Sequence, residues 1–149
     1  MVDDRQVWAG IALAAVLVAV VVGVVLITQY RISATGKIKT LGLKLYSGPD
    51  LKTEVSAIDW GKLAPGDAPH VDLWAVTSGN TPSTLSMNLT NWIPLEASNV
   101  ISLGWNYTGN VLQPKLAIVV RLTLTVSRQI SGIESFSFEI IVTAKETIS

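Results

Sequence analysis

The chain has 149 residues, its eleven Lys and Arg side chains are balanced by eleven Asp and Glu, and it contains no Cys. The missing thiols exclude disulfide frameworks, thiol catalysis, iron–sulfur clusters and zinc knuckles. The balanced charge leaves no basic field of the kind that attracts nucleic acid.

An uncharged apolar segment covers residues 7–29 and is bracketed by Trp8 and Tyr30. As a helix rising about 1.5 Å per residue, it would span roughly 34 Å, enough to cross a hydrocarbon core of about 30 Å. Amphipathic rings such as those of Trp8 and Tyr30 favour the membrane interface. We therefore predict a short tail over residues 1–6 and a transmembrane helix over residues 7–30, through which the protein contacts the lipid bilayer.

A cleavable secretory signal is the alternative interpretation of this segment. The apolar region of such a signal is usually about 7–15 residues long, and residues 32–34 (ISA) make a poor cleavage site. The orientation is predicted from composition, because residues 31–149 are rich in Ser and Thr and poor in Lys. A naive count of the cations after the segment would instead place the C-terminal part in the cytoplasm. Since the lysines from Lys37 onward fall in a predicted strand, we expect an extracellular domain at the cell membrane.

From Thr35 onward, apolar and polar residues alternate with the period of two that is typical of half-buried strands. The clearest strand covers residues 116–127, and its apolar face comprises Val120, Leu122, Leu124 and Val126. The other predicted strands are residues 36–46, 54–58, 71–75, 84–90, 101–107 and 136–142. One-sided alternation indicates antiparallel sheets packed face to face, because buried parallel strands would be apolar on both sides. We predict an all-β domain over residues 31–149, a seven-stranded antiparallel β-sandwich.

The first predicted strand, residues 36–46, changes phase within its length. Ile38 is out of phase with the leucines that follow it, which are Leu41, Leu43 and Leu45. A break near Leu41-Gly42 would let the two halves of the strand pair with different sheets. The turns between the strands are short, which leaves little chain for an active-site lid or a deep pocket.

Two segments resemble a known family pattern. Residues 58–66 (IDWGKLAPG) are similar to a strand-and-turn element of ASH-type and major-sperm-protein-like immunoglobulin folds, and residues 76–82 (VTSGNTP) are similar to a hairpin of the same folds. Ser78 departs from this hairpin pattern, in which Asn is usual. Together with the apolar segment, the chain resembles small anchored surface proteins common in archaea. The resemblance covers residues 35–144 and implies an immunoglobulin-like sandwich, but it leaves the partner open. From the residues themselves, we expect a strand that ends at Trp60, which caps the core, followed by a turn at Pro65-Gly66.

Candidate catalytic and metal-binding residues are few. His70, the single histidine, has no nucleophile arrangement around it in the sequence, so we expect no catalytic role. A calcium site takes several carboxylates from one loop, whereas the acids here are scattered over predicted strands and turns. These acids are Asp50, Glu54, Asp59, Asp67 and Asp72. We expect no metal, no cofactor and no enzyme activity, and we expect Asp59 to accept backbone N–H groups of its own turn.

Four Trp residues follow the apolar segment. Trp60 and Trp105 share the apolar phase of their strands, which predicts core positions. Trp74 is out of phase with its apolar neighbours, and Trp92 lies where a strand ends, so either side chain could be exposed. Exposed aromatic residues anchor protein interfaces or stack on sugar rings, whereas the simpler alternative is that both cover the ends of the sandwich. Trp74 and Trp92 form the candidate interaction surface.

Two N-glycosylation sequons begin at Asn88 (NLT) and Asn106 (NYT). Both Asn residues fall on the polar face of their predicted strands, where a glycan could be accommodated. We therefore treat Asn88 and Asn106 as candidate glycosylation sites of a surface glycoprotein.

Three functions remain open on this basis. The first is a structural or protein-interaction module that contacts other envelope or membrane proteins, or an accessory subunit of a membrane complex. The second is carbohydrate binding, with Trp74 or Trp92 stacking on a sugar. The third is a surface filament in which residues 35–45 of one copy insert into the sheet of the next. We expect the first, with no nucleic acid as partner and with a glycan as the alternative ligand.

Overall fold

A computed structural model describes residues 31–147 of the chain. The predicted tail and the predicted transmembrane helix, residues 1–30, lie outside the described residues. Between residues 31 and 147, no helix is both long and apolar enough to span a bilayer.

The described residues form eight β-strands and a short 3₁₀ helix, η1. The elements are β1 (Ile32–Leu41), β2 (Leu43–Tyr46), β3 (Ala57–Leu63), β4 (His70–Thr77), β5 (Ser83–Ile93), η1 (Leu95–Asn99), β6 (Ile101–Trp105), β7 (Ile118–Val126) and β8 (Ser135–Glu146). The prediction of an all-β fold is therefore confirmed for this part of the chain.

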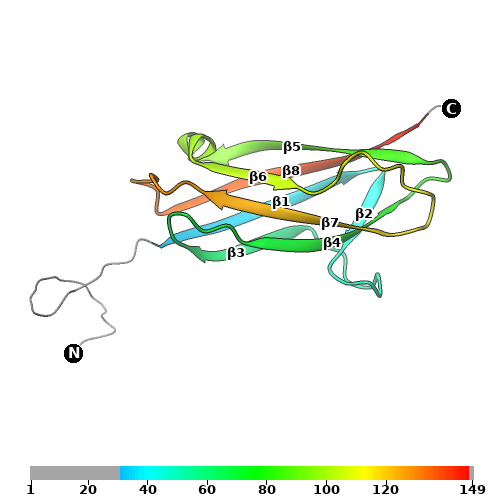
Figure 1. Ribbon diagram of the computed structural model, residues 1–149, viewed down its shortest axis with the longest axis horizontal. Coiled ribbons are helices and arrows are strands. Elements are labelled where there is room, and N and C mark those ends of the chain that lie inside the picture. The colour runs from blue at the N-terminus through cyan, green and yellow to red at the C-terminus, as the bar shows by residue number, and fades with distance from the viewer. Residues whose placement is uncertain (1–30, 148–149) are drawn as a thin grey trace, which may run out of the picture. The chain divides into compact units, whose positions relative to one another are not determined.

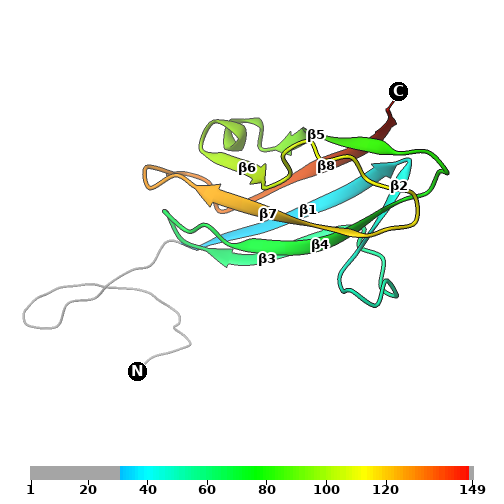
Figure 2. The same cartoon turned by 45° about the vertical axis from the view of Figure 1, so that its right-hand side comes forward.

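The strands form two four-stranded sheets. Sheet 1 has the strand order β3-β1-β8-β5, and sheet 2 has the order β2-β4-β7-β6. The strands of both sheets run along one common direction (Figures 1 and 2). A common strand direction is the arrangement in which two twisted sheets pack face to face with their strands aligned.

The chain passes from one sheet to the other at Gly42, as the change of phase in the sequence predicts. β1 pairs in sheet 1 and β2 pairs in sheet 2. Gly42 has a φ of 79°, a left-handed conformation that residues with a Cβ rarely adopt. Its carbonyl accepts a hydrogen bond from the N–H of Ser78 at 3.1 Å, which ties the crossing point to the end of β4.

The prediction of seven strands in purely antiparallel sheets was wrong in two respects. The division at Gly42 gives eight strands among residues 31–147, and β1 pairs with β8 in parallel, from Ser33 opposite Ser135 to Leu41 opposite Thr143. A parallel pair needs a long crossover connection, and the six strands between β1 and β8 supply it. Both strands are covered on one face only, so their alternation is the same as in an antiparallel pair.

The core lies between the two sheets. Sheet 1 buries alternate residues of its strands, among them Ile32, Ala34, Ile38, Trp60, Phe136, Phe138, Ile140 and Val142. Sheet 2 buries Leu43, Leu45, Leu73, Ala75, Ile101, Leu103, Val120, Leu122, Leu124 and Val126. At roughly 25 cal/mol per Å² of apolar surface removed from water, such a two-sided core is the main stabilising term of the fold.

The boundaries of β3 differ from the prediction. The strand covers Ala57–Leu63 and continues past Trp60, whereas Glu54 makes an isolated bridge to Tyr46. The strand continues through a β-bulge, because Ala34 of β1 lies opposite Gly61 and Thr35 opposite Asp59, which makes Trp60 the extra residue. Gly61 has a φ of 76°, and Asp59 Oδ1 accepts the N–H of Gly61 at 2.9 Å. This bond confirms the role predicted for Asp59.

The segment that follows β6 covers part of the free edge of β5. The hydroxyl of Tyr107 accepts the N–H of Leu85 at 3.0 Å and donates to the carbonyl of Asn110. Ser83 and Leu112 exchange two backbone hydrogen bonds of 3.0 and 2.7 Å. These bonds satisfy edge groups of β5 that would otherwise be open to pairing with another chain.

Candidate functional site

Three side chains form a cross-strand row on the outer face of sheet 2. Trp74 of β4 lies opposite Tyr46 of β2 on one side and opposite Val119 of β7 on the other. Val119 is 49% exposed, and Tyr46 and Trp74 are partly exposed. We call these three residues the Trp74 row. The row is apolar on a face that is usually polar when it meets water.

Charged groups border the Trp74 row along the strands. Arg121 contacts Asp72 through two hydrogen bonds, from Nε to Oδ1 at 2.8 Å and from Nη2 to Oδ2 at 3.2 Å. This contact lowers the pKa of Asp72 and raises the pKa of Arg121, since it favours the charged form of each group. The Trp74 row therefore has a polar rim, as protein interfaces commonly do.

Trp92, the other candidate, occupies a different environment at the end of β5. Its ring stacks on Phe138, with ring centroids 4.5 Å apart and an interplanar angle of 15°, and it lies 6.4 Å from the ring of Phe136. Since both Phe side chains are buried, Trp92 covers the core with one face and remains partly exposed. The structure thus separates the two candidates, with Trp74 on the outer face of sheet 2 and Trp92 on sheet 1.

A β-bulge in β5 contains Asn91 and Trp92. The register of β5 against β8 shifts between Thr90 and Ile93, and Asn91 has a φ of 56°. Asn is among the few residues with a side chain that adopt this left-handed conformation readily. Bulges re-aim side chains and are frequent beside functional sites.

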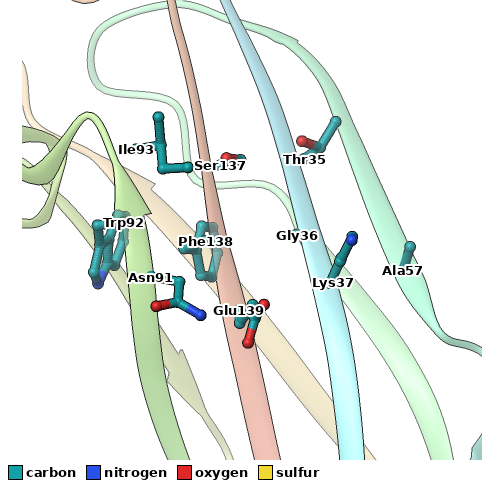
Figure 3. Close-up of a pocket in the computed structure, with 10 residues that line it drawn as sticks. All are labelled: Thr35, Gly36, Lys37, Ala57, Asn91, Trp92, Ile93, Ser137, Phe138 and Glu139. Atoms are coloured by element: carbon teal, nitrogen blue, oxygen red, sulfur yellow. The ribbon is translucent and has the colours of Figure 1, made fainter.

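A hollow of about 690 Å³ lies beside this bulge and extends over all four strands of sheet 1 (Figure 3). We call it the sheet 1 hollow. Its lining residues are Thr35, Gly36, Lys37, Ala57, Asn91, Trp92, Ile93, Ser137, Phe138 and Glu139. The depression forms where β1, β3 and β8 carry short side chains. Longer side chains from β1, β5 and β8 surround it.

Glu139 is the charged centre of the sheet 1 hollow. A hydrogen bond from Asn91 is the main cause that lowers the pKa of Glu139, and Lys39, whose Nζ lies 3.4 Å from Oε1, lowers it further. Figure 3 shows the side chains of Asn91 and Glu139 pointing toward one another. The carboxylate is therefore held ionised and oriented.

The other residues singled out in the sequence stay apart. His70 is exposed at the start of β4. Within residues 31–147, no three His, Asp or Glu side chains gather as metal ligands would. Trp60 is buried as predicted, whereas Trp105 is only partly buried and packs against Tyr107 with centroids 5.2 Å apart. Trp105 is the last residue of the edge strand β6, opposite Leu122 of β7.

Both sequon Asn residues are exposed. Asn88 lies on the edge strand β5, opposite Ile141 of β8. Asn106 follows β6, and its Oδ1 accepts the N–H of Arg121 at 2.8 Å, which leaves the amide nitrogen for modification.

Sequence reasoning missed the sheet 1 hollow. Its key residues, Lys37, Asn91 and Glu139, come from three separate strands and meet through the parallel pairing of β1 with β8 and through the bulge. One signal was available, the polar Asn91 immediately before Trp92 at a strand exit. That signal does not reveal which residues of other strands lie beside it. No family model matches the sequence, and comparison with curated proteins yields no match.

Proposed function

We propose that the chain is a single-pass membrane protein whose extracellular, immunoglobulin-like domain makes structural or protein–protein contacts at the cell envelope. Residues 7–30 are the anchor in this proposal, and the accessory subunit of a membrane complex is one form of the same role. The observation that carries the contact function is the Trp74 row.

The composition of the Trp74 row supports a protein partner. Trp and Tyr are enriched among the residues that dominate interface energetics, because their rings bury a large area with few rotatable bonds. The row lies across three adjacent strands, so its side chains are held by the sheet and lose little freedom on binding. The neighbouring ion pair of Asp72 and Arg121 supplies the polar rim.

Partner capture from native membranes tests this proposal. The tagged full chain is extracted in mild detergent, and co-purifying proteins are identified for the wild type, for Trp74→Ala and for the control Ile141→Ala. Ile141 is a partly exposed apolar residue of the outer face of sheet 1, between Lys39 and Asn88. We expect a partner that Trp74→Ala loses and Ile141→Ala keeps. A partner retained by both variants, or no partner in any sample, contradicts the proposal.

Glycosylation of Asn88 and Asn106 forms part of the proposed surface location. Both side chains are exposed, which is the condition that attachment of a glycan requires. We expect the intact mass of the native protein to exceed the mass of the polypeptide by one or two glycans. The sequence mass alone would remove this part of the proposal.

Strand exchange between copies has less support. The filament hypothesis would donate residues 35–45 to a neighbour. In the described part of the chain, this segment already pairs within the same molecule, through β1 with β3 and β8 and through β2 with β4. Rod-like polymers of the purified protein under the electron microscope would be needed to revive this hypothesis.

A further inference from the structure

We infer that the sheet 1 hollow binds a carbohydrate. This binding function is separate from the protein contacts proposed for the Trp74 row, since the two surfaces belong to different sheets. It uses residues of sheet 1 and leaves Trp74 uninvolved.

The shape of the sheet 1 hollow follows from two neighbouring cross-strand rows. In one row, Lys37 of β1 lies beside Glu139 of β8, and both side chains are long. In the next row on the same face, Thr35 lies beside Ser137, and both side chains are short. The step between these rows makes a depression across the strands. Its volume of about 690 Å³ lies within the range of small-molecule sites, roughly 300–1,000 Å³.

The polar groups of the sheet 1 hollow match the hydroxyl groups of a sugar, each of which donates one hydrogen bond and accepts others. Glu139 and the carbonyl oxygen of Asn91 accept, Lys37 donates, and the hydroxyls of Thr35 and Ser137 do either. The Glu139 carboxylate has about four lone-pair sites, so its bonds with Asn91 and Lys39 leave capacity for a ligand. A site built for a cation has no use for hydrogen-bond donors such as Lys37, and a site built for an anion has no use for a carboxylate such as Glu139. The mixture of donors and acceptors therefore favours a neutral polar ligand.

The apolar side of the sheet 1 hollow suits the C–H faces of a sugar ring. Trp92 and Ile93 both line it, and Ile93 is 67% exposed. The ring of Trp92 packs on Phe138 at the core side of sheet 1, so the exposed apolar surface of the hollow comes from Ile93. Apolar contact beside convergent hydrogen-bonding groups is the combination that binds small polar ligands such as sugars.

The backbone conformation of Asn91 supports a role for this residue in ligand binding. A residue with a Cβ is held at a φ of 56° at the bulge, and its amide is directed to Glu139. The bulge thus brings the Asn91 amide to the carboxylate of Glu139, and bulges are frequent beside functional sites.

A glycan array with the full-length protein in detergent micelles, followed by calorimetric titration of the sugars that bind, tests this inference. The informative variant is Asn91→Gly, because Gly adopts the same positive φ while the side-chain amide is removed. Loss of one or more hydrogen bonds should weaken sugar binding about tenfold or more. Glu139→Gln keeps the shape and removes the charge, and it should weaken binding as well.

The controls separate this site from the surface proposed for protein contacts. Ser86→Ala changes an exposed residue of β5 outside the hollow, and Trp74→Ala changes the other sheet, so both should leave sugar affinity unchanged. The inference is overturned if no sugar on the array binds. It is equally overturned if Trp74→Ala abolishes sugar binding while Asn91→Gly retains it. Failure to capture a protein partner would contradict the proposal for the Trp74 row alone.

Discussion

At the scale of single residues, side chains that bridge elements carry consequences that can be measured. Tyr107 connects the segment after β6, in sheet 2, with β5, in sheet 1. Asn91 and Lys39 connect with Glu139 on the outer face of sheet 1. The first contact satisfies the N–H of Leu85, and the second pair satisfies the carboxylate of Glu139.

Tyr107→Phe should lower the free energy of unfolding by about 1–3 kcal/mol, because it leaves the N–H of the buried Leu85 without a partner. Tyr46→Phe is the matched control. Between residues 31 and 147, the Tyr46 hydroxyl makes no hydrogen bond, so a change within about 0.5 kcal/mol is expected. Urea denaturation followed by Trp fluorescence measures both values. Equal values for the two variants would show that the Tyr107 bond contributes nothing.

The lowered pKa of Glu139 predicts a pH dependence of stability. Because the folded-state pKa lies below the unfolded-state value, the ionised carboxylate stabilises the fold above the unfolded pKa. This contribution is lost as the pH falls through the folded pKa. The Glu139→Gln variant lacks the carboxylate and therefore lacks this contribution at every pH. Its Tm should fall less than that of the wild type between neutral and acidic pH. Parallel Tm curves for the two proteins would contradict the prediction.

At the scale of elements, the division of the first predicted strand is the main determinant of the topology. Gly42 separates β1 from β2, and a Cβ at this position would lie 3.1 Å from the carbonyl oxygen of Ala144. The crossing from sheet 1 to sheet 2 therefore needs both a positive φ and the absence of a side chain.

Gly42→Ala should destabilise the domain by about 1–2 kcal/mol from the left-handed conformation alone, and by more once the contact with Ala144 is included. Gly79→Ala is the control, because a Cβ there meets nothing within 4 Å and its φ is not positive. The control should change the free energy of unfolding by at most about 0.5 kcal/mol. Denaturant midpoints that fall equally in both variants would reject a special role for Gly42.

Element-level features differ in how far the sequence predicts them. The alternation of residues 120–126 identifies β7, and the phase change before Leu41 identifies the break, because burial acts directly on side-chain periodicity. The parallel pairing of β1 with β8 leaves no such mark, since each strand still buries one face. Strand neighbours depend on contacts between residues far apart in the chain, and local patterns do not contain them.

The same distinction applies to the candidate sites. The exposure of Trp74 follows from its phase relative to Leu73 and Ala75, which a single strand displays. The sheet 1 hollow needs the register of four strands and the bulge at Asn91, so it becomes visible only in three dimensions.

At the scale of the whole molecule, the two sheets offer different outer faces. Sheet 2 presents the apolar Trp74 row, and sheet 1 presents a polar hollow with a charged centre. Two chemically distinct faces on one domain suit a surface module that contacts a protein on one side and a glycan on the other. We propose this arrangement, with the protein contact on sheet 2 and the glycan on sheet 1.

Site-specific photo-crosslinking in native membranes tests the central claim most directly. A photoreactive residue replaces Val119 in the Trp74 row, and in a second protein it replaces Ile141 on the outer face of sheet 1. We predict a covalent adduct with another protein from position 119 and none from position 141. Adducts from position 141 alone, or none from position 119, would contradict the assignment of the protein contact to the Trp74 row.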